Sequence, residues 1–517
     1  MKSKRKLLSL RFKVIVFLLI LLMAPLQATY KVSAQEEEAV QKQRIESVKQ
    51  YIREQMLVSN IPGLAISIVH DGKSVMEEGF GYANLAEQEP VTDKTRFELG
   101  STSKAFTGLA VLQLENMGLL KRDDPVTDYI PWLRMSYKGQ PVEITLNHFL
   151  HHTSGIPFAS IGRIPASEAK DALELTVRTL LNQPLNRMPG SSFEYATINY
   201  DVLGLVIEKV TGQSYELYIR ESILGPLGMT ATMATMPMPS DERAAGYKIA
   251  FGKQREYTPP VYRGNIPAGY ISSNAQDMTK WIMFQLHAIG TSEIEHSLIT
   301  DSHVSDRSVK PDMDGSYYAG GWSVYGDKQA ISHTGNNPTF SSFVALYPDS
   351  KTGVAVLLNT NSKHAADIGR ATLGIWLGHS PELVERYSDD FLMIDRAVSW
   401  LLLVWGGLSL VFLFLIGKVL TGIRHKQRER TKFTRKQGGL LSIHLFIFTL
   451  LAVTFISLLR YLFQELPWSF IEVWSPSSLP YALYGSFIMI ILYVIYASLS
   501  VLFRKIDRNA ASTKHFE

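Results

Sequence analysis

Long uncharged segments are concentrated near the C-terminal end of the chain. Three segments contain no Lys, Arg, Asp or Glu: Ala397–Gly417 over 21 residues, Leu440–Leu459 over 20 and Ser475–Phe503 over 29. A helix of about 20 apolar residues is long enough to cross the hydrocarbon core of a bilayer. The pattern therefore predicts three transmembrane helices, and buried core helices are the alternative.

The polar stretches beside these segments predict their orientation. Residues 418–436 contain eight Lys or Arg and a single Glu, and Arg504, Lys505 and Arg508 follow the third segment. Basic loops of membrane proteins stay in the cytoplasm, so both stretches are expected there. This orientation leaves the long segment before residue 390 outside the cytoplasm.

The N-terminus has the order of a secretory signal. Four of its first six residues are Lys or Arg, an apolar run covers Val14–Pro25, and "VSAQEEE" follows. Basic, apolar and small-residue segments in this order predict a signal peptide, cleaved after Ala34 or Ala28. An uncleaved N-terminal anchor is the alternative.

Between the N-terminal segment and the three C-terminal segments, the spacing of hydrophobic residues changes from a strand period to a helix period and back. A polar helix is expected over Glu36–Met56, and a hairpin is expected in "GLAISIVHDGKSVMEEGFGYAN", with its turn at Asp71-Gly72. Residues 105–300 follow mostly helical spacing. Strand patterns return from Gly320 in "GGWSVYG", "QAISHTG", "SSFVALYP" and "TGVAVLLNT". Strands at both ends predict an α+β fold, in which one antiparallel sheet is flanked by helices and joined by an all-helical region.

These patterns divide the chain into nine expected segments. They are a signal peptide (1–34), an extracytoplasmic domain (35–380), a linker (381–396), a transmembrane helix (397–417), a basic cytoplasmic loop (418–439), a second transmembrane helix (440–459), an extracytoplasmic loop (460–480), a third transmembrane helix (481–503) and a cytoplasmic tail (504–517). The expected location is thus a cell membrane, crossed several times.

Composition excludes several classes of function. A net charge of +4 at pH 7 over 517 residues is too small for a nucleic-acid-binding protein. The chain has no cysteine, which excludes disulfide bonds and thiol catalysis. The absence of cysteine does not identify the compartment, because many exported proteins also lack it. The oligomeric state is not predicted.

Candidate chemistry begins in "FELGSTSKAFTGL", where Ser101 and Ser103 precede Lys104 at a helix start. Residues i and i+3 share a helix face, so the Lys104 ammonium can reach the Ser101 hydroxyl, whereas Ser103 lies off that face. A serine becomes a nucleophile when a base lies beside it, and a lysine serves when burial lowers its pKa. An ordinary N-cap serine with a solvated lysine is the alternative.

Two further elements strengthen the catalytic interpretation. "FEYATINYDVLG" places Tyr195 between a Pro-Gly loop and a helix, where its side chain can enter a cleft. "ISHTGNNPTFSS" places His333, Thr334 and Gly335 at the end of a strand, where glycine lets a ligand approach the backbone. Ser-x-x-Lys, a loop tyrosine and a Lys/His-Thr-Gly strand, in this order, are typical of the serine penicillin-recognising enzymes.

Residues 45–375 resemble the class C β-lactamase and D,D-peptidase-like serine hydrolases. "IPGLAISIVHDGK", "HFLHHTSGIP", "AGYISSNAQDM" and "YAGGW" are similar to landmarks of that family. "YATINYDVLG", "SHTGNNPTFSS" and "WSFIEVWSPSS" further resemble one branch, the membrane-anchored peptidases, such as the colibactin-maturation peptidase, that remove an acyl-D-asparagine leader from nonribosomal peptide prodrugs. That branch also has a signal peptide and three C-terminal membrane helices.

The resemblance implies a role for each matching residue. Ser101 would be acylated, Lys104 would be its base, Tyr195 would relay protons, and the backbone N–H groups of Ser101 and Asn336 would form the oxyanion hole. The positions expected to contact the substrate are Thr197, Asn265, His333, Thr334, Gly335 and Asn337. No cofactor and no metal ion are expected.

Two positions depart from the family pattern. Thr197 stands where most members have an Asn that contacts the substrate amide, which weakens a β-lactamase interpretation. Asn265 stands where the prodrug-peptidase branch has a histidine that binds the D-asparagine side chain, which leaves that specificity open.

Three other patterns have structural explanations. Lys351-Thr352-Gly353 is a literal Lys-Thr-Gly, but its position after "YPDS" predicts a hairpin turn. The cluster of His148, His151 and His152 has no carboxylate at ligand spacing, and a family turn explains it better than a metal site. His444, inside the second membrane segment, is expected to make a hydrogen bond between helices rather than to relay protons.

The leading hypothesis is a membrane-anchored serine peptidase or amidase that acts outside the cytoplasm on a peptide or acyl-peptide. Within it, prodrug maturation competes with cell-wall targets, either D-alanyl peptides or D-alanyl esters on teichoic acid. A non-catalytic penicillin-binding sensor has no need of Ser101, Lys104 and Tyr195 together. A transporter component is disfavoured, because three membrane segments without internal symmetry do not fit one.

Overall fold

The computed structural model describes residues 38–326, 330–378, 389–430, 434–462 and 466–506. The predicted signal peptide, residues 381–388 of the predicted linker and residues 507–517 of the predicted tail lie outside this part of the chain. Contacts divide the chain into a larger unit (59–369 and 387–517) and a smaller one (1–58 and 370–386). The described part of the smaller unit is helical. It contains the N-terminal helix, as the sequence predicts, and the end of α10 (His364–Trp376).

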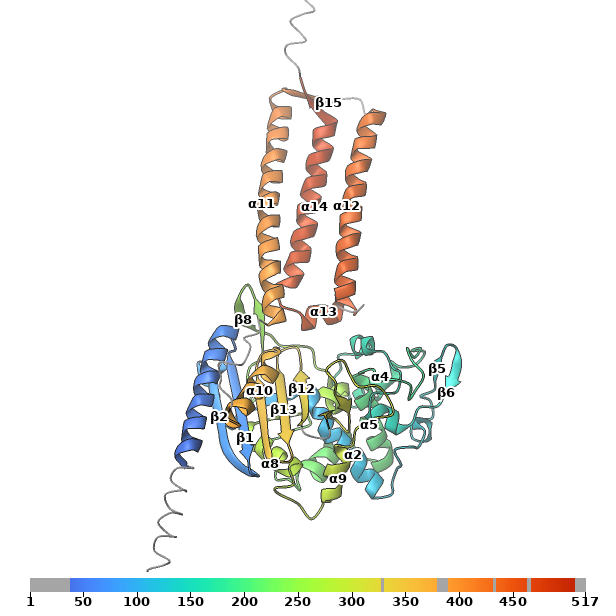
Figure 1. Cartoon of the computed structure of the whole chain (residues 1–517). Coiled ribbons are helices and arrows are strands. Elements are labelled where there is room, and N and C mark those ends of the chain that lie inside the picture. The colour runs from blue at the N-terminus through green and yellow to red at the C-terminus, as the bar shows by residue number, and fades with distance from the viewer. Residues whose placement is uncertain (1–37, 327–329, 379–388, 431–433, 463–465, 507–517) are drawn as a thin grey trace, which may run out of the picture. The chain divides into compact units, whose positions relative to one another are not determined.

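An antiparallel sheet in the larger unit joins strands from the two ends of the domain, which confirms the predicted α+β fold (Figure 1). Central strand β1 pairs with β14 near the end of the domain and with β2 in the predicted hairpin. Asp71 and Gly72 both have positive φ, +49° and +70°, as a two-residue hairpin turn requires. In sheet order the strands are β10 (Tyr317–Tyr318), β11 (Ser323–Tyr325), β12 (Ala330–Asn336), β13 (Ser341–Tyr347), β14 (Thr352–Leu358), β1 (Gly63–His70), β2 (Lys73–Asn84) and β3 (Glu89–Pro90).

Helices pack on both faces of the sheet. Gly353 of β14 lies against Ile282 of α8, whereas Phe343 of β13 lies against Gly369 of α10. Gly353 pairs with Leu346 of β13. Leu346 and Phe343 are three positions apart on this strand, so their side chains point to opposite faces of the sheet. α8 and α10 therefore cover different faces, and α8 also carries Trp281, which stacks on Phe106 of α2 at 4.0 Å.

A mostly helical region separates the two groups of strands. Its helices are α2 (Lys104–Asn116), α3 (Leu146–Leu150), α4 (Ala172–Arg178), α5 (Ile198–Thr211), α6 (Tyr215–Ile219), α7 (Ile266–Gly269), α8 (Ala275–Gln285) and α9 (His296–Ser302). Three small strand pairs interrupt it: β4 (Phe97–Glu98) with β9 (Ser272–Ser273), β5 (Met135–Tyr137) with β6 (Gln140–Val142), and β7 (Tyr247–Ala250) with β8 (Lys253–Glu256).

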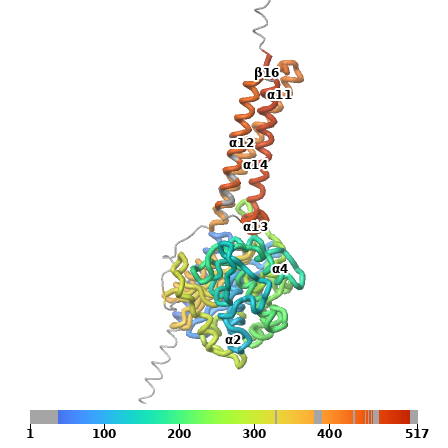
Figure 2. Tube along the Cα trace, turned by 90° about the vertical axis from the view of Figure 1, so that its right-hand side faces the viewer, coloured from blue at the N-terminus to red at the C-terminus, as the bar shows by residue number. Residues whose placement is uncertain are grey.

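Three long apolar helices follow, each long enough to cross a membrane by length and composition. They are α11 (Asp390–Arg424), α12 (Arg435–Leu462) and α14 (Leu479–Leu502), and they run side by side (Figure 2). α11 begins seven residues before the predicted segment, because the Asp389 carboxylate accepts a hydrogen bond from the Phe391 N–H and caps the helix. A short helix, α13 (Trp468–Trp474), lies between α12 and α14 in the chain.

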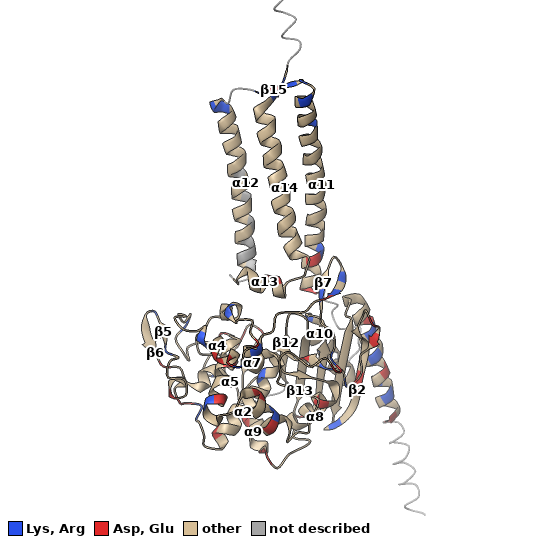
Figure 3. Ribbon diagram, turned by 180° about the vertical axis from the view of Figure 1, so that it is seen from behind, with Lys and Arg blue, Asp and Glu red and all other residues tan. Residues whose placement is uncertain are grey.

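A small strand pair forms where the sequence predicts a basic loop and a tail. β15 (Arg428–Arg430) pairs with β16 (Phe503–Lys505), and basic residues gather at this end (Figure 3). The predicted helix–helix hydrogen bond of His444 is wrong. Its Nδ1 pairs with the Leu440 carbonyl of its own helix at 2.7 Å, and only its ring approaches α14, 5.9 Å from Tyr493.

The β7–β8 hairpin connects the domain to the start of α11 and the end of α13. The backbone N–H groups of Phe251 and Gly252 donate to the fully buried Asp395 carboxylate of α11, at 2.9 and 2.7 Å. Lys248 donates to the carbonyls of Glu472 and Val473 at the end of α13, both at 2.9 Å. The long apolar helices are therefore hydrogen-bonded to the domain as well as joined to it by the chain.

The distribution of basic residues predicts a topology that reporter fusions can test. An alkaline phosphatase that folds only outside the cytoplasm should be active when fused after Asp390 and silent when fused near Lys432, because basic loops are retained inside. A cytoplasmic reporter should give the opposite pattern at the same positions. Phosphatase activity near Lys432 and none after Asp390 would contradict the exported domain.

Candidate active site

The structure brings Ser101 and Lys104 into hydrogen-bond contact where a short 3₁₀ helix (Gly100–Ser103) leads into α2. Lys104 Nζ lies 3.0 Å from Ser101 Oγ and 2.7 Å from the Ala268 carbonyl oxygen of α7. The i, i+3 spacing places both side chains on one face, as predicted. Ser101 is partly exposed, so a substrate can reach its hydroxyl.

Lys104 is the largest charged side chain that the fold buries completely. Burial lowers its pKa from 10.5 to about 7, and the negative charge of Asp201 partly opposes this decrease. Its Nζ lies 5.1 Å from the ring centre of Tyr195 and 5.7 Å from that of Tyr200. A large fraction of Lys104 is therefore a neutral amine at neutral pH, and a neutral amine can accept a proton.

Ser103 has a different environment from Ser101. It is fully buried, and its Oγ accepts a hydrogen bond from the Ile271 N–H at 3.1 Å. This bond attaches the start of α2 to the segment that follows α7. Ser103 therefore contributes to the packing of the domain and faces away from Lys104.

Tyr195 lies in the loop before α5, with its ring against His152. The two ring centres are 4.2 Å apart, and His152 Nδ1 faces the Ala196 N–H at 3.3 Å and the Asn199 amide at 2.9 Å. Burial, together with the charge of Lys104, holds the pKa of His152 well below its usual range, so the ring is neutral. His152 therefore positions the tyrosine loop. Sequence reasoning missed this role.

The Tyr195 hydroxyl is buried and has no hydrogen-bond partner among the described residues. Burial raises its pKa, while the neighbouring Ser101 hydroxyl lowers it. The tyrosine therefore keeps its proton at neutral pH and lies close to Ser101. Such a hydroxyl can donate to a group that enters the site.

Strand β12 passes close to Ser101, and two glycines permit this approach. A Cβ on Gly335 would lie 1.9 Å from the Leu99 carbonyl oxygen, and a Cβ on Gly100 would lie 2.4 Å from the Asn336 nitrogen. Asn337 N–H donates to Phe340 O across the β12–β13 turn, so the adjacent Asn336 N–H points to the other edge of the strand.

That other edge of β12 is open beside Ser101. On this edge, β11 pairs only with residues 330–332 of β12, and in the described part of the chain no strand pairs with the same edge of the positions that follow. Thr334 and Asn336 are exposed there. An extended peptide can pair with such an edge, and the Asn336 N–H then faces it.

His333 is buried, and both of its ring nitrogens are paired within the protein. Its Nε2 lies 2.9 Å from the Tyr318 hydroxyl, and its Nδ1 lies 2.6 Å from the Thr334 carbonyl oxygen. Burial and the charge of Lys104 lower its pKa to about 3. The imidazole is therefore neutral throughout the physiological range, and this position supplies no positive charge to a substrate.

The structure pairs two of the predicted substrate-binding asparagines with buried carboxyl groups. Asn337 Nδ2 donates to Glu98 Oε2 at 2.7 Å and to the Gly269 carbonyl at 2.9 Å. Asn265 faces Asp201, and when its amide is oriented to donate, the nitrogen lies 3.0 and 3.1 Å from the two carboxylate oxygens. Both asparagines are thus used within the protein, whereas Thr197, directly before α5, makes no capping hydrogen bond.

Sequence reasoning missed Glu98 and Asp201. Burial raises the pKa of Glu98 to about 7, against the opposing effects of Asn337 and Arg243. Burial also raises the pKa of Asp201 well above its usual value. A signal was present, because each acid stands among apolar neighbours, in "FEL" and "YDVLG", at positions expected to be buried.

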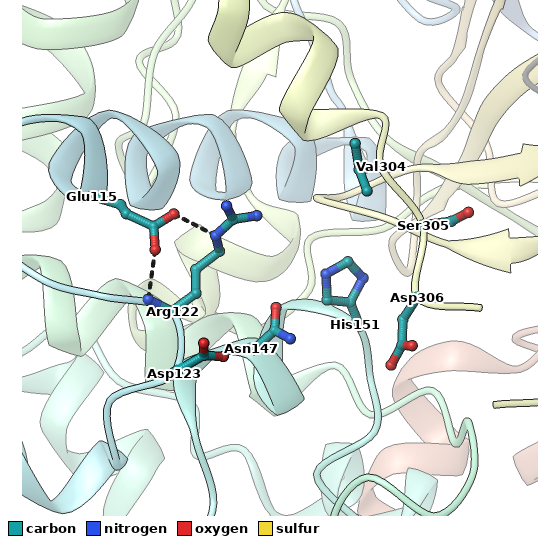
Figure 4. Close-up of a pocket in the computed structure, with 8 residues that line it drawn as sticks. All are labelled: Glu115, Arg122, Asp123, Asn147, His151, Val304, Ser305 and Asp306. Carbon is teal, nitrogen blue, oxygen red and sulfur yellow. Dashed lines mark hydrogen bonds and ion pairs between the residues drawn. The ribbon is translucent and has the colours of Figure 1, made fainter. Parts of the chain in front are cut away.

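The three histidines of the cluster have separate structural roles. His148 completes the capping box of α3, His152 contacts Tyr195, and His151 lines a separate cavity of about 330 Å³ (Figure 4). An ion pair between Glu115 and Arg122 forms one side of that cavity. Among the described residues, no group of three His, Asp or Glu side chains is arranged to hold a metal ion.

Lys351-Thr352-Gly353 lies at the opposite end of β13 from the site. The Lys351 N–H donates to the Pro348 carbonyl in a turn, and Thr352 pairs with Tyr347. The six residue steps from Ser341 to Tyr347 separate this turn from the β12 end by about 20 Å. The predicted hairpin turn is confirmed.

Comparison with known proteins gives consistent matches. The family profile described as Beta-lactamase matches residues 48–375. Protein flp of Staphylococcus aureus (strain COL) is 30% identical over 448 residues, which cover 84% of this chain and 88% of the relative. A Bacillus subtilis (strain 168) protein named as a penicillin-binding protein, PbpX, is 31% identical over 348 residues, covering 66% and 80%.

A solved structure also resembles the chain. The octameric penicillin-binding protein homologue from Pyrococcus abyssi superimposes with a TM-score of 0.58 at 29% identity. The match covers 69% of this chain and 81% of the archaeal one.

Proposed function

Since the chain belongs to the β-lactamase and penicillin-binding protein family of serine hydrolases, we propose that it is a membrane-anchored peptidase or amidase that acts outside the cytoplasm. Its substrate is an N-acyl-D-amino-acid leader, with D-asparagine or a similar residue, on a nonribosomal peptide. The observation that carries the proposed reaction is the fully buried Lys104 amine, 3.0 Å from Ser101 Oγ.

The reaction proceeds through an acyl-enzyme. Neutral Lys104 accepts the Ser101 proton while Oγ attacks the scissile carbonyl carbon, and the backbone N–H groups of Ser101 and Asn336 stabilise the oxyanion. The C–N bond then breaks, and the leaving amine takes a proton through Tyr195. A water molecule hydrolyses the ester on Ser101 by the same steps in reverse order, which restores neutral Lys104.

The neutral charge of His333 favours a substrate in which the scissile bond lies inside a longer chain. A D-alanyl-D-alanine peptide and a β-lactam both carry a carboxylate close to the bond that is cleaved, and an uncompensated carboxylate is costly to desolvate. With the pKa of His333 lowered to about 3, this position provides no charge to compensate it. An amide that continues into a longer chain has no such requirement.

Two other observations support a leader that carries a polar side chain and an acyl tail. Thr334 and Asn336 are exposed at the open edge of β12, and their polar side chains suit a carboxamide better than an apolar side chain. The β7–β8 hairpin also lies against α11, where a pocket of about 450 Å³ is lined largely by apolar side chains such as Trp400 and Leu403. Apolar side chains of this kind accommodate an acyl tail.

The assignment of the nucleophile can be tested with a matched pair of serine variants. Ser101→Ala should abolish labelling by a fluorophosphonate probe and abolish turnover. Ser103→Ala should keep labelling but lower the melting temperature, because it leaves the Ile271 N–H without its acceptor at a cost of about 1–3 kcal/mol. Equal labelling of wild type and Ser101→Ala would refute the assignment.

The proposed substrate class can be tested by kcat/KM on purified protein in detergent. We expect faster cleavage of an N-acyl-D-asparaginyl amide than of its L-isomer, a D-alanyl-D-alanine peptide, a D-alanyl ester or a β-lactam, because polar residues at the open edge of β12 can hydrogen-bond a carboxamide and the neutral His333 supplies no charge for a substrate carboxylate. Faster turnover of either D-alanyl substrate would instead assign the enzyme to the cell wall.

A further inference from the structure

Three successive backbone carbonyls of α7 accept hydrogen bonds from the site. Thr107 Oγ1 donates to Pro267 O at 2.6 Å, Lys104 Nζ donates to Ala268 O at 2.7 Å, and Asn337 Nδ2 donates to Gly269 O at 2.9 Å. The last carbonyls of a helix have no partner within the helix, so α7 presents them to other elements. The position of Lys104 therefore depends on the position of α7.

Asp201 of α5 holds the residue from which α7 starts. The Asn265 amide nitrogen lies 3.0 and 3.1 Å from its two carboxylate oxygens, immediately before Ile266. α5 packs closely on α7 at the next turn, where a Cβ on Gly204 would lie 2.4 Å from Pro267 Cγ. Asp201 is thus connected to Lys104 through Asn265 and α7.

Asp201 and Lys104 also interact through their charges. Both are fully buried, and the charge of each shifts the pKa of the other toward the ionised form. The other titratable groups that face Lys104 are Tyr195, Tyr200, His152 and His333. Those that face Asp201 from neighbouring elements are Tyr215 and Tyr270.

Asp201 is the one carboxyl group among the titratable groups named around Lys104 and around Asp201 itself. The histidines are neutral, and burial raises the pKa of each tyrosine, so none of them supplies a compensating negative charge near neutral pH. Burial raises the pKa of Asp201 as well, but a positive charge on Lys104 lowers it again, so a cation that forms on Lys104 is compensated by Asp201 alone among these groups.

We propose that Asp201 is a positioning residue for the reaction: it fixes α7 through Asn265 and stabilises the ammonium that Lys104 forms when it accepts the Ser101 proton. This inference rests on the proposed acylation of Ser101. Asp201 lies outside the Ser-x-x-Lys, tyrosine and His-Thr-Gly motifs. The inference gives it control of the proton affinity of the base, Lys104.

The experiment measures the rate of fluorophosphonate labelling of Ser101 against pH in wild type and Asp201→Asn. Removing the carboxylate lowers the pKa of Lys104, so the amine stays neutral to lower pH. The acid limb of the labelling rate should therefore move to lower pH by about one unit, as expected for loss of a nearby opposite charge. The maximum rate should decrease, because the ammonium formed in the reaction loses its counter-charge.

Thr107→Val is the matched control, because it removes a hydrogen bond to α7 without removing a charge. It should lower the labelling rate by the same factor at every pH and leave the acid limb in place. Asp201→Ser serves as a second neutral variant if the asparagine variant does not fold, as judged by its melting temperature.

The outcomes separate this inference from the proposed function. Wild-type protein that the probe does not label would refute the proposed acylation itself. A labelled wild type with the same acid limb in Asp201→Asn, Asp201→Ser and Thr107→Val would refute the role of Asp201 and leave the acylation intact. A shift in the two Asp201 variants alone supports the inference.

Discussion

The site depends on the complete burial of one lysine. A charged ammonium in a protein interior costs several kcal/mol unless it is paired, so burial shifts Lys104 toward the neutral amine. The hydroxyl of Ser101, the Ala268 carbonyl and the rings of Tyr195 and Tyr200 surround that amine. The same burial keeps His152 and His333 neutral, since their own desolvation and the charge of Lys104 act in the same direction.

The fold achieves this burial by bringing distant backbone segments very close together. β12 can lie against the start of α2 because Gly335 and Gly100 have no side chain at the point of contact. α5 can lie against α7 because Gly204 meets Pro267. Larger residues at these points would separate the elements that exclude water from Lys104, so glycines inside the motifs and beyond them, such as Gly204, help to set its proton affinity.

Much of the fold could be predicted from the sequence, because its signals are local. The hairpin at Asp71-Gly72, the four C-terminal strand patterns and the three membrane segments each follow from a period or a turn within a few residues. The Ser101–Lys104 contact is also local, since helix geometry alone brings positions i and i+3 together.

The remaining features depend on contacts between residues far apart in the sequence. Asp201 with Asn265 and Glu98 with Asn337 are pairs that no period or spacing identifies. The direction of the Asn265 side chain, toward Asp201 rather than a substrate, likewise depends on how α5 packs against α7. Local patterns therefore predicted which residues gather at the site, and tertiary packing decided which of them are left to meet a substrate.

The measurement that tests this account most directly is the pH dependence of Ser101 acylation in the wild-type protein. Single-turnover rates should be recorded from about pH 5 to about pH 9, within the range where a lysine of pKa about 7 loses its proton. The account predicts a rate that is half-maximal near pH 7 and falls tenfold for each unit of pH below it. A rate that is still rising at pH 9, as for an ordinary lysine, or one independent of pH would contradict it.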